Sequence, residues 1–147
     1  MILPITLTIA GAAAILNLWL SLRVGLLRHR LKISIGDGGD ERVARRMRAH
    51  ANFAENMPIM LILVGFVELA TGGGLWLWGA GIVFIFARIL HAFGMDRQGA
   101  NALRGIGILL TLLTQLALGI WAILIAYQSP ALHASTHPRG QEISIGR

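Results

Sequence analysis

Three polar side chains recur on one face of a segment that leads into an apolar span. Arg48, Asn52 and Glu55 are spaced i, i+4 and i+7, which places them within roughly 60° of one another around a helix. A cation, an amide and a carboxylate in this pattern can hold a zwitterion, because the arginine binds a carboxylate and the glutamate an ammonium. Ionisable groups are costly near hydrocarbon, so we expect this face to line a bundle interior or a polar cavity. The structural alternative is an Arg48–Glu55 ion pair that only orients the helix.

More ionisable residues follow at the ends of later apolar spans. Arg88 and His91 would share a helix face, and Arg104 begins the last span. His91 beside Arg88 could act as an acid–base residue, although an interfacial histidine more often only packs and hydrogen-bonds.

The composition is that of an integral membrane protein. Of the 147 residues, 55% are hydrophobic and 14% charged, and the mean hydropathy is +0.67, which is too apolar for an ordinary soluble domain. Without cysteine the chain can form neither disulfides nor thiolate metal sites, so any sulfur chemistry must come from a ligand. The net charge of +6 comes from residues beside apolar spans, which points to membrane topology rather than nucleic-acid binding.

Four apolar spans predict an all-α, four-transmembrane-helix bundle in an up-down-up-down order. Each is long enough to cross the hydrocarbon core of a bilayer. The first has no basic segment before it, so we expect it to remain as an anchor rather than to be cleaved as a signal peptide. Residues 1–128 are expected to form this single domain, and 129–147 a polar, disordered tail. The spans cover about 2–27, 41–70, 75–93 and 104–127.

The distribution of basic residues predicts the orientation in the membrane. Arginine and lysine gather in the loops before the second and fourth spans, whereas the loop at 71–74 has none. The positive-inside rule therefore places the first and third loops in the cytoplasm and both termini outside. Glu68 falls at the far end of the second span, where we expect a solvated carboxylate. Pro58 lacks the amide hydrogen that a helix interior needs and predicts a local kink.

One motif resembles a known family. Arg48-Ala49-His50-Ala51-Asn52, followed by Glu55 and Pro58, resembles the signature of the MAPEG family, the membrane-associated proteins of eicosanoid and glutathione metabolism. Phe86-Ala87-Arg88, Gly94 and Arg104 extend the resemblance to residues 15–127. It implies a homotrimer of four-helix subunits that holds glutathione between subunits, while a lipophilic second substrate arrives from the bilayer. The positions that match family glutathione contacts are Arg28, Arg48, His50, Asn52, Glu55, Arg88 and Arg104.

The sequence also departs from the family pattern. Asn56, His91 and Met95 stand where tyrosines line the site in the better-known eukaryotic members. His50 occupies a contact position that is often glutamine.

We therefore expect a glutathione transferase or peroxidase in a bacterial inner membrane, acting on lipophilic electrophiles. Arg104 would be its catalytic residue. The thiol of glutathione reacts as its thiolate, which a nearby positive group favours, and arginine stays protonated and is weakly hydrated. Glutathione would be a co-substrate, no metal is needed, and the partners would be further copies of the chain, membrane lipid and a lipophilic small molecule, without nucleic acid. The residues expected to bind glutathione are Arg28, Arg48, His50, Asn52, Glu55, Arg88 and His91.

Three alternatives remain open from the sequence. The first is a non-catalytic relative that binds an anionic lipid or another thiol through the same arginines. The second is a small four-helix transporter in which Glu55 or Glu68 couples to protons. The third is haem ligation by His50 and His91.

Overall fold

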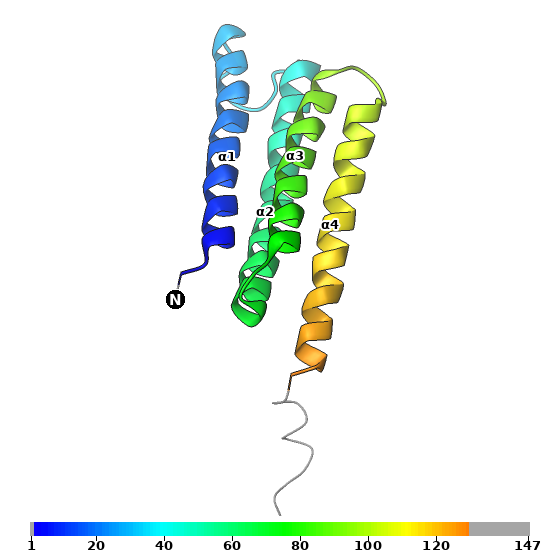
Figure 1. Ribbon diagram of the computed structural model, residues 1–147. Coiled ribbons are helices and arrows are strands. Elements are labelled where there is room, and N and C mark those ends of the chain that lie inside the picture. Colours follow the sequence, from blue (N-terminus) through cyan, green and yellow to red (C-terminus); the bar gives the residue numbers. More distant parts are fainter. Residues whose placement is uncertain (1, 130–147) are drawn as a thin grey trace, which may run out of the picture.

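The computed structural model describes residues 2–129, and over this range the chain forms helices without a strand. The four helices lie side by side as one bundle (Figure 1), and each is long and apolar enough to cross a membrane. Their ends differ from the predicted ends by at most three residues. The predicted helix number is therefore confirmed for this part of the chain, while 130–147 of the predicted tail lie outside the described residues. The helices are α1 (Pro4–Arg30), α2 (Glu41–Thr71), α3 (Leu75–Asp96) and α4 (Ala102–Tyr127).

Capping residues explain where two helices begin. The Asp40 side chain accepts a hydrogen bond from the backbone nitrogen of Arg42 at 2.8 Å and so caps α2. The hydrogen bond from the Arg42 guanidinium lowers the pKa of Asp40 to about 2, so the cap is ionised at neutral pH. Asn101 caps α4 through the backbone nitrogen of Arg104, 3.1 Å away, and donates to the Gly94 carbonyl at 2.9 Å. These bonds make the link between α3 and α4 shorter than predicted.

Glu68 is not the solvated carboxylate that its position in the sequence predicts. Its side chain is 2% exposed and accepts hydrogen bonds from the backbone nitrogens of Ile5 and Thr6, at 2.9 and 2.7 Å. The Thr6 hydroxyl donates a third bond at 2.6 Å. The first amides of a helix have no intrahelical acceptor, and the helix dipole favours a negative charge there. Glu68 of α2 therefore caps α1, and the expectation was wrong because the partner comes from a distant part of the sequence.

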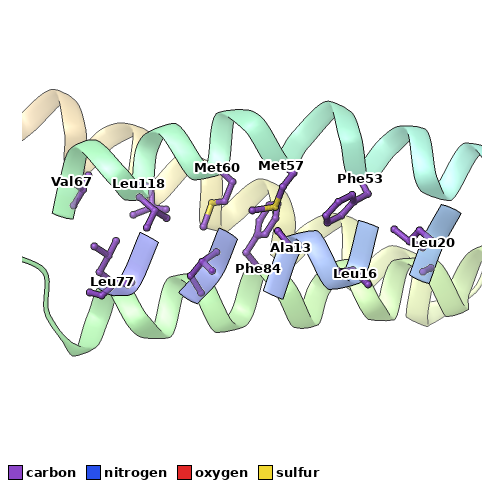
Figure 2. Close-up of a cluster of buried hydrophobic side chains, with 14 residues drawn as sticks. Ala13, Leu16, Leu20, Phe53, Met57, Met60, Val67, Leu77, Phe84 and Leu118 are labelled. Carbon is purple, nitrogen blue, oxygen red and sulfur yellow. The ribbon is translucent and has the colours of Figure 1, made fainter. Parts of the chain in front are cut away.

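The two central helices are α2 and α3. Each packs against all the others, whereas α1 and α4 lie on opposite sides of the bundle. Figure 2 shows the shared core, in which Phe53, Met57 and Met60 of α2 lie along the same cluster as Phe84 of α3 and Leu118 of α4. This arrangement leaves four outer grooves: two flank α2, and two flank α3.

Two glycines let α4 approach α3 closely near the capped end. A Cβ at Gly107 would lie 2.7 Å from both the Ala87 oxygen and the His91 nitrogen. A Cβ at Gly94 would lie 2.7 Å from the Cα of Arg104. Both distances are shorter than van der Waals contact, so only glycine fits at this crossing. The close approach brings the first turn of α4, which carries Arg104, against the α3 turn that carries His91.

Candidate functional site

A buried polar cluster built on Arg88 joins α2, α3 and α4. The Arg88 side chain is 1% exposed, and its Nη2 donates to Oδ1 of Asn52 at 2.7 Å. Nη1 lies 3.3 Å from Oγ1 of Thr111, and Nη2 lies 3.3 Å from Nδ1 of His91. A guanidinium only donates, so His91 accepts through Nδ1 and carries its own proton on Nε2. The cluster thus fixes the orientation of both Asn52 and His91.

The cluster has no carboxylate of its own. Among residues 2–129, no acidic side chain hydrogen-bonds to Arg88, and its Nε has no partner. Three of the predicted residues, Asn52, Arg88 and His91, are therefore brought together by α2 and α3. Arg104 lies in the first turn of α4, which packs closely against α3 at Gly94. A cavity of about 110 Å³ beside them is lined by Asn52, Asn56, Arg88, Ile108, Thr111 and Leu112.

The outward side of α2 carries Arg48 and Glu55. Both are exposed, because Phe53 and Met57 occupy the opposite, buried face of the helix. The ion pairs of the described chain involve other residues, so neither Arg48 nor Glu55 is neutralised. We expected this face to line a bundle interior or a polar cavity. Within one subunit this expectation is wrong for Arg48 and Glu55, which are exposed, and it holds only in part for Asn52, which is half-buried. The Arg48–Glu55 pair of the structural alternative is not formed either.

Arg28 of α1 and His50 of α2 lie on the side of α2 that faces away from the Arg88 cluster. His50 Nε2 is 2.9 Å from Oδ1 of Asn17 on α1, and Arg28 donates to the carbonyl of Ser34. Both line a groove of about 440 Å³ between α1 and α2. His50 is therefore separated from the cluster that holds His91, and one chain does not bring the two histidines to a common haem iron.

The predicted binding residues thus fall into three groups. Asn52 and His91 belong to the Arg88 cluster, Arg28 and His50 line the groove between α1 and α2, and Arg48 and Glu55 are exposed. We call the exposed pair Arg48 and Glu55 the outward stripe. It lies on α2 between the Arg88 cluster on one side and the groove with Arg28 and His50 on the other, because these positions follow one another around the helix.

Sequence reasoning missed the residues that orient the site. Thr111 hydrogen-bonds Arg88, and its own hydroxyl donates to the Gly107 carbonyl at 2.8 Å. Asn17 holds His50. The available signal was that each is a polar residue inside an apolar span, which identifies a residue with a partner but not the partner itself.

The sequence matches a family of known proteins and two curated relatives. The sequence profile of the MAPEG family matches residues 6–124. Two curated relatives, both named Inner membrane protein YecN, come from Escherichia coli strain K12 and from Escherichia coli O6:H1 strain CFT073. Each is 31% identical over 90 residues, which is 60% of this chain and 68% of the relative. Together with four helices of membrane-spanning length, these matches identify an integral, multi-pass membrane protein.

Proposed function

This chain belongs to the MAPEG family, and we propose that it is a membrane-embedded glutathione-binding enzyme of the transferase or peroxidase type. The observation that carries the proposal is the outward stripe. Arg48 and Glu55 are opposite charges two helical turns apart, and both are exposed and unpaired within the described chain. They lie beside Asn52, which Arg88 holds at 2.7 Å. Opposite charges left unpaired at fixed separation suit a ligand that carries both signs.

Glutathione has this chemistry, with two carboxylates, one ammonium and a thiol. Arg48 would bind a carboxylate and Glu55 the ammonium. Arg88 occupies Oδ1 of Asn52, which leaves the amide nitrogen Nδ2 to donate to a ligand oxygen. Arg104 would favour the thiolate, since an opposite charge within about 4–6 Å shifts a pKa by roughly 1–3 units. Its place in the first turn of α4 adds the positive end of a helix dipole.

We propose a homotrimer as the assembly that completes the site. Exposed charges on a helix face in hydrocarbon are costly, so the outward stripe needs a cover that the described chain does not supply. The groove with Arg28 and His50 offers polar side chains on the adjacent face. If this groove of one subunit covers the outward stripe of the next, glutathione lies between subunits and a lipophilic second substrate reaches it from the bilayer.

The proposed orientation follows from the basic residues and the relatives. The helices would cross the membrane up-down-up-down, with both termini on the non-cytoplasmic side. The name of the two Escherichia coli relatives supports a place in the bacterial inner membrane.

The rival functions require different roles of particular charged residues. A non-catalytic relative would use the outward stripe to bind an anionic lipid or another thiol, without any role for Arg104. A proton-coupled transporter would need a carboxylate free to exchange protons along a pathway. Glu68 is engaged in three hydrogen bonds that cap α1, which leaves it poorly suited to that role.

Titration calorimetry of the detergent-solubilised protein with glutathione tests the proposal. We expect saturable binding that Arg48→Ala weakens by about 1.5–3 kcal/mol, the usual loss for a charged hydrogen bond. Arg104→Ala should bind nearly as well but lose the ultraviolet thiolate absorbance of bound glutathione. Arg97→Ala, an exposed arginine at the same end of the bundle, is the control and should match wild type. Binding without any thiolate signal in wild type would exclude the enzyme, and no binding would exclude glutathione.

A further inference from the structure

A groove between α1 and α3 has an apolar part that opens away from α2. It has a volume of about 560 Å³, and its walls include Ala12 and Trp19 of α1 and Ile89 and Phe93 of α3. Its lining is entirely apolar, and large apolar side chains such as Ile15 and Ile82 remain exposed around it. This part of the groove suits a hydrocarbon chain.

The apolar part ends at an ion pair that bridges the two helices. Arg23 of α1 pairs with Asp96 of α3, and the Arg23 guanidinium lies 4.4 Å from the ring centroid of Trp19 and 5.9 Å from that of Phe93. Arg46 of α2 also pairs with Asp96, with its Nε 3.3 Å from Oδ1 of Asp96. Asp96 is thus shared by two arginines, so the bridge as a whole keeps a positive charge.

A basic pocket of about 220 Å³ follows beyond this bridge. It is lined by Leu27, Arg42, Arg45, Arg46 and Asp96. Each of the three arginines also has a carboxylate partner: Arg42 binds Asp40, Arg45 binds Glu41, and Arg46 binds Asp96. The pair between Arg45 and Glu41 is a surface contact, since the Glu41 side chain is 79% exposed, and such pairs contribute little. Nε of Arg45 is buried without a hydrogen-bond partner. A guanidinium has five N–H groups, and the pairs with Asp40 and Glu41 do not use all those of Arg42 and Arg45. The pocket therefore keeps guanidinium donors for an anion.

The apolar part and the basic pocket lie one after the other along α1. Ala12, Trp19, Arg23 and Leu27 lie within about 80° of one another around α1, so the same face of that helix lines both. The groove between α3 and α4 differs, because its lining ends in Trp76 and Trp121 and includes no charged residue.

We propose that the α1/α3 groove binds one phospholipid with an anionic headgroup. An acyl chain lies in the apolar part, and the phosphate contacts Arg42 and Arg45 in the basic pocket. The order of apolar and basic surfaces along the groove matches the order of chain and headgroup in a lipid, and arginine binds phosphate oxygens through paired donors. This site is separate from the outward stripe and does not depend on the proposed enzyme activity.

Native mass spectrometry with phosphatidylglycerol and phosphatidylcholine of identical acyl chains tests the headgroup contact. The wild-type protein should retain phosphatidylglycerol in preference to phosphatidylcholine. The double variant Arg42→Gln/Arg45→Gln should lose about 25-fold of this preference, since each basic residue near a membrane surface contributes roughly fivefold. Arg30→Gln/Lys32→Gln removes the same charge at the same end of the bundle without touching the pocket lining, and it should retain the preference. If both double variants lose it equally, the effect is diffuse surface charge and the site does not exist.

The apolar part is tested by filling it. Ala12→Phe places a ring in the groove and should reduce retention of phosphatidylglycerol, whereas Ala14→Phe, an exposed alanine on another face of α1, should not. Glycerophosphoglycerol, the headgroup without chains, should compete poorly. Equal competition by that compound or by inorganic phosphate would overturn the lipid assignment in favour of a free-phosphate site. Should the double arginine variant fail to fold, as judged by circular dichroism, Arg45→Gln alone is measured, with about a fivefold loss expected.

Discussion

Glu68 and Arg88 are both buried charges, but their partners give them different roles. Glu68 has its hydrogen-bonding capacity met by the start of α1, which makes it a structural cap. Among residues 2–129, the hydrogen-bond partners of Arg88 are neutral: Asn52, Thr111 and His91. A buried cation surrounded by neutral acceptors keeps its charge available to a ligand, and so Arg88 can support the site while holding Asn52 in place.

We expect Glu68→Ala to free the start of α1. The amides of Ile5 and Thr6 would lose an acceptor that now lies within 2.9 Å of each, and removing a hydrogen bond to a charged group costs about 1.5–3 kcal/mol. Amide hydrogen exchange should therefore accelerate at these two residues, with little change in α3. Glu41→Ala removes an exposed carboxylate and is the matched control. Unchanged protection at Ile5 and Thr6 in Glu68→Ala would show that the cap contributes nothing.

At this scale the sequence predicts which residues are special but not what each one contacts. The spacing of Arg48, Asn52 and Glu55 and the choice of Arg88 and His91 as polar residues in apolar spans follow from helix periodicity alone. The partners depend on the rotation of neighbouring helices, which periodicity does not determine. Glu68 was misjudged for this reason, because the amides that it binds, those of Ile5 and Thr6, belong to another helix.

The contact between α3 and α4 is the element on which the position of Arg104 depends. Gly107 faces the α3 backbone with no room for a methyl group, whereas Gly105 has nothing within 4 Å of its Cβ position. The two glycines lie in the same turn of α4 but face different surroundings. The direction of a glycine-to-alanine change should therefore differ between them.

Gly107→Ala should lower the thermal stability of the detergent-solubilised protein, and Gly105→Ala should leave it unchanged or raise it. Overpacking costs about 1–3 kcal/mol, and here it is opposed by the helix propensity of alanine, worth roughly 1 kcal/mol over glycine. At Gly105 a methyl group meets no neighbour within 4 Å, so the gain in helix propensity is not opposed by overpacking. Equal melting temperatures for the two variants would contradict the close approach of α4 to α3.

The ends of the helices were more predictable than their packing. Asp40 before an acidic residue, the glycines at 72–74 and the lengths of the apolar runs place the boundaries, because caps and turns act locally. The extra turn of α3 and the earlier start of α4 come from Asn101, whose bond to the Gly94 carbonyl joins residues that a local pattern does not connect.

As a whole, the bundle has two unlike sides. The grooves that flank α2 contain the polar residues Arg28, His50, Asn52 and Arg88, whereas the cavities that flank α3 are lined almost entirely by apolar side chains. The apolar side that flanks α3 can face the hydrocarbon of a bilayer, whereas the polar side that flanks α2 cannot do so without a large cost in free energy. The number of spans follows from hydropathy, but this division into sides does not, since it depends on which helices are neighbours.

The membrane orientation should place the loop between α2 and α3 outside. No basic residue lies at 71–74, and the opposite end of the bundle carries Arg42, Arg45 and Arg46, so the positive-inside rule assigns that end to the cytoplasm. Reporter fusions at Gly73 and after Tyr127 should both give the non-cytoplasmic signal. A cytoplasmic signal at either position would move the Arg88 cluster to the other face of the membrane.

A site shared between subunits should be restored by mixing two defective variants. Arg28 and Arg48 lie on different faces of one subunit, so in the proposed trimer a site takes Arg28 from one copy and Arg48 from the next. Arg28→Ala and Arg48→Ala homotrimers should each bind glutathione weakly. Co-expressed in equal amounts, they should recover tight binding at about one quarter of the sites, because random assembly in a closed ring pairs two intact faces with that frequency. Native mass spectrometry should show trimers in all three preparations. Mixed trimers without any tight sites would mean that each subunit binds alone, and only monomers or dimers would contradict the assembly itself.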